Sequence, residues 1–234
     1  MHALFFRASA GLILPALLTA PLTAADWPGF RGPNGSGVAA TSVLPVKFSP
    51  TENVVWKTPL PAGKSSPVLT DQHIFLTAWQ ENDLLTIAMD RKTGQVLWRQ
   101  AVQRDRSEQL HQLNSPASST PATDGTNVYV FFGDFGLVSY GPDGNERWRM
   151  PLGPFTNLHG MSASPIVVGD QVVLACDQDE ESYLLDRRRG IQRLHQVIHG
   201  ATLRRSPRTA SLIYVRTDSA LYAFPAALIS HDAG

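Results

Sequence analysis

The chain has 234 residues, of which 43% are hydrophobic and 17% are charged, so it can bury the core of one domain or of a small repeat array. Twenty basic side chains balance twenty acidic ones, and the formal net charge at pH 7 is zero. This balance gives no support for nucleic acid or an anionic membrane surface as a partner and argues against a polyanionic ligand.

The first 25 residues have the pattern of a secretory signal peptide. An apolar run from Ala8 to Leu22, interrupted by two prolines, precedes the small residues Thr23-Ala24-Ala25. The run is short for a membrane span, so a retained anchor or a buried helix is the weaker interpretation. We expect a periplasmic or secreted chain that starts near Asp26 and keeps no stable membrane anchor. Its single cysteine, Cys176, excludes an intrachain disulfide.

Residues 26–39, DWPGFRGPNGSGVA, contain four glycines within nine positions. Glycine-rich loops can cradle a phosphate, but a P-loop ends in Gly-Lys-Ser/Thr and a dinucleotide fingerprint lies between a strand and a helix. This stretch has no lysine and no helical pattern follows it. The sequence therefore predicts that residues 26–55 form an extended arm that lies against the rest of the protein.

A tryptophan-centred motif repeats along the remainder of the chain. Its tryptophan position is occupied by Trp56, Trp98, Trp148 and, with leucine in its place, Leu194, at intervals of 42 to 50 residues. This period is typical of propeller blades. Turn residues stand before the last three copies, and these are Asp90, Thr93 and Gly94, then Asp143 and Gly144, then Asp186 and Gly190.

The residue types of this motif have a physical explanation. The carboxylate of Asp90 can accept hydrogen bonds from backbone amides inside its own turn, and Gly94 can adopt the positive φ that a short hairpin loop needs. The tryptophan then leaves the turn on the outgoing strand. We expect it to bury its ring at the seam between neighbouring sheets.

Proline provides a second landmark with the same period, at Pro67, Pro121, Pro165 and Pro207. A turn and then a short apolar strand follow each proline, and the four strands read HIFLTAW, NVYVFF, QVVLAC and LIYVRT. Runs rich in β-branched and aromatic residues, bounded by Pro, Gly and Asp, are typical of strands. The predicted fold class is all-β.

The stretch Ala88-x-Asp90-x-x-Thr93-Gly94-x-x-x-Trp98 resembles the tryptophan-docking repeat of the PQQ-type quinoprotein β-propellers, a group that includes propellers of the BamB kind. The likeness covers residues 26–186 and resumes at 213–224. It implies a propeller of four-stranded blades over residues 56–230, in which the arginine-rich stretch 187–210 is irregular. About four blades are present, whereas propellers of this group usually have seven or eight. We therefore expect a partial or open ring.

Two stretches approach catalytic or metal-binding patterns. Gly160 to Ser164, GMSAS, is close to the Gly-x-Ser-x-Gly nucleophile elbow, but it lacks the last glycine and the α/β context. His195 and His199 are four residues apart, which suits a metal only on a helix with a third ligand. We expect neither a catalytic residue nor a metal site there.

Two weaker candidates remain. The acidic run CDQDEES could offer oxygen ligands to calcium, but it lacks the pattern of an EF-hand loop, and its carboxylates are those of Asp177, Asp179, Glu180 and Glu181. His159 stands in a predicted loop at the end of the blades. A solvated loop and a hydrogen-bonded loop histidine are the simpler interpretations.

Three functional interpretations stay open. The first is an exported, non-catalytic binding or scaffold module that contacts a protein partner, or a second copy of itself, through loops or exposed blade edges. The second is a quinoprotein dehydrogenase or its remnant, for which the resemblance implies PQQ, Ca²⁺ and an adjacent cysteine pair. Cys176 alone cannot form that pair. The third is a truncated gene copy, because no acidic residue lies between Arg187 and Arg216.

The signal pattern makes a direct prediction about processing. Because small residues precede Asp26, we expect the exported protein to begin near that residue. Mass spectrometry of the exported product would check this start. An intact segment from Met1 to Ala25 on that product would show that the interpretation is wrong.

Overall fold

The structure is a computed structural model. It describes residues 27–38, 49, 54–104 and 106–179, together with the backbone of five later strands between Tyr183 and Pro225. A 3₁₀ turn, η1 (Pro33–Gly35), is the only helical element in this described part. All other regular structure is β-strand, so the predicted all-β class is confirmed.

Fifteen strands form four antiparallel sheets, which we call blades 1 to 4. Blade 1 contains β1 (Val68–Leu69), β2 (His73–Gln80), β3 (Asp83–Asp90) and β4 (Val96–Gln103). Blade 2 contains β5 (Ala122–Thr123), β6 (Val128–Phe132), β7 (Gly136–Tyr140) and β8 (Glu146–Pro151). Blade 3 contains β9 (Ile166–Val168), β10 (Gln171–Cys176), β11 (Tyr183–Arg188) and β12 (Gly190–Leu194). Blade 4 contains β13 (Thr202–Arg204), β14 (Leu212–Arg216) and β15 (Leu221–Pro225).

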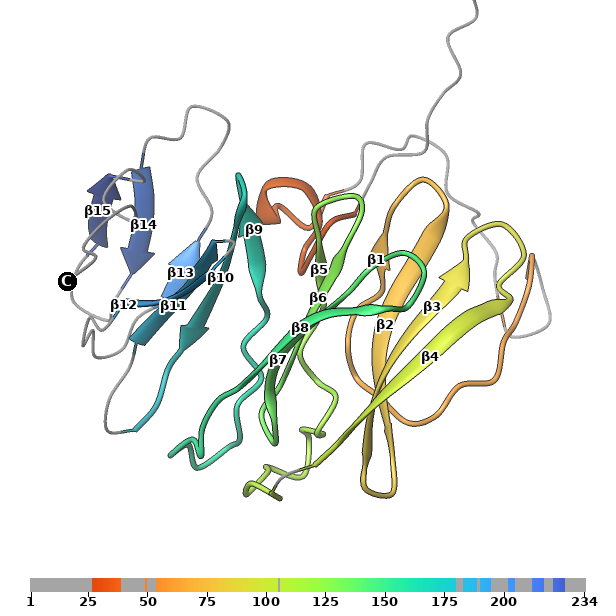
Figure 1. Cartoon of the computed structure of the whole chain (residues 1–234), viewed down its shortest axis with the longest axis horizontal. Helices are drawn as coiled ribbons and strands as arrows, with labels where there is room; N and C mark the ends of the chain where they lie inside the picture. Colours follow the sequence, from red (N-terminus) through yellow and green to blue (C-terminus); the bar gives the residue numbers. More distant parts are fainter. Residues whose placement is uncertain are drawn as a thin grey trace, which may run out of the picture.

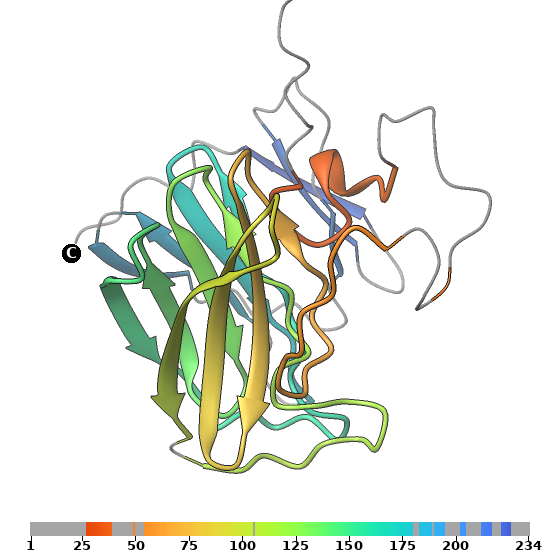
Figure 2. The ribbon, with the colours of Figure 1, turned by 90° about the vertical axis from the view of Figure 1, so that its right-hand side faces the viewer.

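The blades stand side by side in chain order, from blade 1 at the right to blade 4 at the left of Figure 1. The perpendicular view in Figure 2 shows their strands stacked face behind face. Blades 1 and 4 lie on opposite sides of the molecule and do not meet in the described residues. The arrangement is an unclosed part of a β-propeller, as the repeat predicted.

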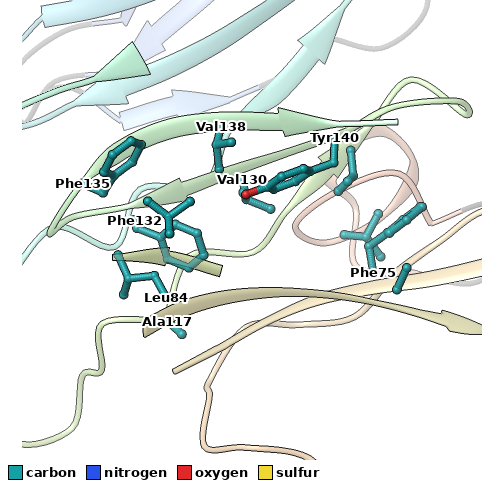
Figure 3. Packing of buried hydrophobic residues seen from close by; sticks show 12 residues of the cluster. Phe75, Leu84, Ala117, Val130, Phe132, Phe135, Val138 and Tyr140 are labelled. Carbon is teal, nitrogen blue, oxygen red and sulfur yellow. The ribbon is translucent and has the colours of Figure 1, made fainter. Parts of the chain in front are cut away.

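Two apolar clusters hold the first three blades together. One cluster joins blade 1 to blade 2 and includes Phe75, Leu84, Phe132 and Tyr140 (Figure 3). The other joins blade 2 to blade 3 and includes residues of β7, β8 and β10. Successive residues of β6 alternate between the two clusters, because side chains of a strand point to opposite faces. No blade covers its own faces, so each depends on its neighbours.

The turn between β3 and β4 has the predicted chemistry. One carboxylate oxygen of Asp90 accepts hydrogen bonds from the Lys92 amide at 3.0 Å, the Thr93 amide at 2.7 Å and the Thr93 hydroxyl at 2.8 Å. These bonds, that from the Thr93 amide first, hold the pKa of Asp90 below its usual value. Gly94 has φ of 71°, a conformation that L-residues with a side chain rarely adopt. The turn is therefore fixed by Asp90 and permitted by Gly94.

Tryptophan links each such turn to the preceding segment of chain. The Trp98 ring of blade 1 lies over Gly144 in the β7–β8 turn of blade 2, and its Nε1 donates to the Pro142 carbonyl at 2.9 Å. Trp56 covers Gly94 in the same way. Both rings lie at a seam, but they are half-buried rather than enclosed.

A second alignment crosses each of these sheets. In blade 1, Phe75 of β2, Ala88 of β3 and Trp98 of β4 are direct neighbours in register, and the two rings are 6.0 Å apart over the alanine. The corresponding residues of blade 2 are Tyr129, Ser139 and Trp148, with rings 5.9 Å apart. A small residue in the middle strand thus lets two aromatic rings meet above it.

The third copy of the turn differs in length. Asp186 lies within β11, Gly190 begins β12, and Arg188 pairs with Gly190, so one residue separates the two strands. In this sheet Leu194 lies opposite Leu184, without a tryptophan. Both β12 and β13 fall within residues 187–210, the stretch of unusual composition, and Pro207 lies outside the described residues.

We expect Gly144→Ala to destabilise the protein more than Gly125→Ala. Both glycines have positive φ, but a Cβ on Gly144 would lie 2.9 Å from the Trp98 ring, whereas a Cβ on Gly125 meets nothing within 4 Å. The expected losses are about 2 to 4 kcal/mol and about 1 kcal/mol. Urea unfolding of both variants measures the difference, and equal losses would show that the ring contact contributes nothing.

Candidate functional site

Two long connections meet at one end of the blades, the lower end in Figure 1. They run from β4 to β5 and from β8 to β9, and they pass beside the β6–β7 hairpin. We call these connections and that hairpin the loop end. Buried charges fix its backbone, and two exposed leucines lie on its surface.

Arg106 lies at the centre of the loop end. Its Nε donates to the Glu108 carboxylate at 2.8 Å, and its Nη2 donates to the carbonyls of Gly133, at 2.6 Å, and Leu152. The same Glu108 oxygen accepts the Phe155 amide at 3.0 Å. One guanidinium and one carboxylate, the latter 8% exposed, therefore join the connections that follow blades 1 and 2 to the hairpin of blade 2.

A second ion pair lies beside the first. The Arg104 guanidinium is 2.6 Å from the Asp134 carboxylate, whose side chain is 1% exposed. The other carboxylate oxygen of Asp134 accepts the Glu108 amide at 2.9 Å. Because breaking a buried pair leaves an uncompensated charge, these contacts hold the loop end in one arrangement.

Two histidines connect the long loops at the surface. The ring centroids of His111 and His159 are 5.5 Å apart, edge to face, and the His111 amide donates to the His159 carbonyl at 3.2 Å. The Asn114 side-chain amide donates to the same carbonyl at 3.0 Å. The His111 Nδ1 accepts a hydrogen bond from the Leu113 amide and is therefore not available as a metal ligand. The histidine pair holds the two loops together.

Leu113 and Leu158 lie next to these histidines in the chain and are 75% and 61% exposed. Lys64 donates to the Leu113 carbonyl at 2.6 Å, and the Leu158 amide donates to the Asp179 carboxylate at 3.0 Å. The backbone thus fixes both leucines while their side chains face solvent. Single exposed apolar residues are common on protein surfaces, and these two offer apolar area on a fixed backbone that a partner could cover.

An open groove of about 1080 Å³ runs along the inner strands of the blades. Its lining mixes apolar residues and glycines with hydroxyl and amide side chains, and the latter include Ser66, Ser118, Thr120, Ser162, Ser164, Asn114 and Asn157. Its described charges are the cations Arg31 and Lys64 and the carboxylates Asp124 and Asp177. The groove therefore offers apolar contact, hydrogen-bonding groups and charges of both signs.

Hydroxyl groups connect the blades along this groove. The Ser66 amide of blade 1 donates to the Thr120 hydroxyl of blade 2 at 3.1 Å. The Thr120 amide donates in turn to the Ser164 hydroxyl of blade 3 at 3.0 Å. Each of these residues directly precedes one of the periodic prolines, which explains why Ser or Thr stands there.

Asp124 lies at the rim of the groove. Its partial burial acts to raise its pKa, but hydrogen bonds from the Tyr129 hydroxyl, at 2.6 Å, and from the amides of Asn127 and Thr126 outweigh this and lower the pKa. Burial and the same carboxylate raise the pKa of Tyr129. The carboxylate is thus committed to the turn that it caps.

The glycine-rich segment lies along the groove at the end of the blades that is opposite to the loop end. Trp27 pairs with Leu69 of β1 through two hydrogen bonds of 3.0 and 2.9 Å, and the Pro28 carbonyl accepts the Thr123 amide of β5. Amides of the loop that follows donate to oxygens of the same loop; they belong to Gly32, Gly35, Ser36, Gly37 and Val38. They are therefore not arranged to cradle a phosphate.

The structure places the other candidate residues in loops. The Ser164 hydroxyl accepts the Thr120 amide and the strand β9 follows it, so GMSAS is not a nucleophile elbow on a strand-to-helix turn. Asp179 binds the backbone of the second long loop through its carboxylate and its amide. His195, His199, Glu180 and Glu181 lie outside the described residues.

The described residues show no set of side chains that fits the calcium and PQQ site of a quinoprotein dehydrogenase. In the part of the chain that the structure describes, no three His, Cys, Asp or Glu side chains come close enough to share a metal ion. Cys176 is buried in the cluster between blades 2 and 3 and does not line the groove. The described lining of the groove therefore offers hydrogen-bonding groups but no set of side chains that could ligate calcium beside PQQ.

Sequence reasoning missed the buried charges and the exposed leucines. The polar stretch after β4 looks like a solvated loop, and it contains Arg104, Arg106 and Glu108. Asp134 lies further along the chain, in the β6–β7 hairpin. No local pattern signals that these groups meet. Leu113 and Leu158 interrupt polar loops, which is the only available signal for them.

The repeat, the blades and the docked tryptophans agree with one protein family. Residues 46–227 match the model of the family described as outer membrane protein assembly factor BamB. The chain belongs to this family. A search of curated proteins finds no match to it. Within the described residues, no helix has the length and apolar character needed to cross a membrane.

Several solved structures are similar to this chain at low sequence identity. The quinohemoprotein alcohol dehydrogenase from Comamonas testosteroni is 18% identical, with a TM-score of 0.51, 71% of this chain covered and 26% of that chain. BamB from Moraxella catarrhalis is 12% identical, with a TM-score of 0.48 and coverages of 74% and 52%. A europium-containing methanol dehydrogenase is 14% identical, with a TM-score of 0.41 and coverages of 56% and 23%. This BamB-family chain thus spans about a quarter of the dehydrogenases and about half of the solved BamB.

Arg106→Ala should destabilise the loop end strongly. It leaves the Glu108 carboxylate and the carbonyls of Gly133 and Leu152 without their donor, and we expect a loss of about 3 kcal/mol. The control, Arg147→Ala, removes a solvent-exposed pair with Asp143 and should cost less than about 1 kcal/mol. Calorimetry compares the two, and a similar loss in both would contradict a structural role for Arg106.

Proposed function

We propose that this chain is an exported, non-catalytic member of the BamB family that acts as a binding or scaffold module for another protein. The contact surface is the loop end. The observation that carries the proposal is the exposure of Leu113 and Leu158 on a backbone fixed by the buried Arg106–Glu108 and Arg104–Asp134 pairs.

A rigid surface of this kind suits protein recognition. Fixed apolar side chains lose little conformational freedom when a partner covers them, so more of the burial energy is available for affinity. The groove, with its polar and apolar lining, lies beside Leu113, which is itself part of that lining. A partner with an apolar contact and an extended polar segment would use both features.

The proposed location is the periplasm or the extracellular space. The N-terminal pattern of apolar residues, prolines and small residues supports export. The family description, an outer membrane protein assembly factor, is compatible with that location.

A dehydrogenase function is the alternative, and its support is the shared fold of quinohemoprotein alcohol dehydrogenase. A cofactor performs chemistry only where a protein site positions it. The described groove contributes two separated carboxylates, Asp124 and Asp177, and no cysteine. The residues therefore favour binding over redox catalysis.

Cross-linking in the producing cell tests the proposed surface. A photoreactive amino acid at position 113 or 158 should give one discrete adduct of the same partner. The control is position 97, where leucine is 48% exposed on β4, away from the loop end. The same adduct from position 97, or no adduct from 113 and 158, would contradict a contact at the loop end.

A cofactor titration tests the alternative. We expect purified protein to bind PQQ with Ca²⁺ at no defined stoichiometry and to catalyse no dye-linked alcohol oxidation. Calorimetric titration and an activity assay measure the two properties. Stoichiometric binding with turnover would establish the dehydrogenase function instead.

A further inference from the structure

The arc has two open ends, and they are complementary. At the first end, Val54-Val55-Trp56 repeats the pattern of Val96-Leu97-Trp98, which forms the start of β4. The tryptophans have the same task, because Trp56 covers Gly94 as Trp98 covers Gly144. Residues 54–58 therefore occupy the place of the outermost strand of a blade that would precede blade 1.

This segment lacks the partner that its counterpart has. Val96 and Trp98 pair with Met89 and Ala88 of β3, whereas residues 54–58 form no strand ladder in the described part of the chain. Val55 is 90% exposed. An exposed, unpaired and β-branched segment is ready to join the edge of a sheet.

At the other end, blade 4 has the opposite deficiency. Blades 1 to 3 each contain four strands, but the described part of blade 4 contains three, and β15 pairs with β14 alone. Tyr214 lies opposite Ala223 in this pair. Tyr214 and Ala223 stand at the register positions that Phe75 with Ala88 and Tyr129 with Ser139 hold in the complete blades.

In the described part of blade 4, only the tryptophan of that alignment is missing. In blades 1 and 2 the small residue is flanked by an aromatic residue on one strand and by tryptophan on the other. Trp56 has no paired strand within the described residues, and so it has neither the small neighbour nor the aromatic neighbour that Trp98 and Trp148 have. The two ends together supply one complete four-stranded blade.

We propose that residues 54–58 of one copy of this chain add to the free edge of β15 in a second copy, with Trp56 opposite Ala223. Trp56 would keep its place over Gly94 of its own blade 1, just as Trp98 both pairs with β3 and covers Gly144. Reciprocal exchange closes two copies into a ring of eight blades, twice the four of one chain and within the usual range for propellers.

A second copy fits better than the same chain. Residues 54–58 and β15 lie at opposite sides of the molecule in Figure 1, with blades 1 to 3 between them. This inference rests on strand register and not on the proposed protein-binding function, so each can fail without the other.

Disulfide trapping tests the register. Lys57 would lie opposite Tyr222, as Arg99 lies opposite Ile87 in blade 1 and Arg149 opposite Val138 in blade 2. Lys57→Cys and Tyr222→Cys are purified as separate proteins, mixed and oxidised. We expect a disulfide between position 57 of one copy and position 222 of the other, identified by non-reducing gels and mass spectrometry.

The control replaces Tyr222→Cys with Val215→Cys, the β14 neighbour of Tyr222, which lies one strand further from the edge and should not link. The protein carrying both Lys57→Cys and Tyr222→Cys should form linked dimers. An intrachain link in a monomer would overturn the second copy as occupant. Absence of the 57–222 link, or equal linking at position 215, would overturn the register.

Light scattering gives a measurement that needs no cysteine. We expect the purified chain to have twice its monomer mass and Trp56→Ala to have the monomer mass. Leu97→Ala, which truncates an exposed apolar residue at the corresponding strand of blade 1, should remain dimeric and so controls for a general loss of apolar surface. A monomeric wild-type chain would overturn the proposal.

Discussion

The contact between an indole ring and a bare glycine determines how one blade stands against the next. Trp98 can lie flat on the β7–β8 turn only because Gly144 has no Cβ, and Gly144 can form that turn only because it tolerates positive φ. Two separate requirements, one of space and one of backbone conformation, therefore select the same residue. The apolar clusters between blades and the hydroxyl contacts along the groove can form only when this spacing is correct.

The two ends of the blades have different physical characters. At the end with the glycine turns, carboxylates such as Asp90 and Asp124 cap short loops and hold them close to the strands. At the loop end, buried ion pairs hold the long connections in place. They fix the backbone from within, so the side chains on the surface are not needed for packing. The apolar side chains of Leu113 and Leu158 are exposed on this fixed backbone. The function that we propose follows from this division.

The periodic features of the sequence predicted the periodic features of the structure. Tryptophan spacing and proline spacing located the strands, and β10 and β14 begin at the residues where the apolar runs QVVLAC and LIYVRT begin. Contacts between distant segments could not be predicted in this way. Arg106 reaches Gly133 and Leu152 across two connections, and nothing in the local sequence distinguishes it from a solvated arginine. Trp98 lies at the seam between sheets, as expected, but its ring there is only half-buried.

The hydroxyl contacts along the groove run in one direction. The amides of Ser66 and Thr120, each just before a periodic proline, donate to an oxygen of the following blade, Thr120 and Ser164 respectively. The glycines of two turns, Gly94 and Gly144, are in contrast covered by an indole from earlier in the chain. Truncation of the chain at either of these seams would therefore leave an indole ring without its glycine turn and a backbone amide without its acceptor.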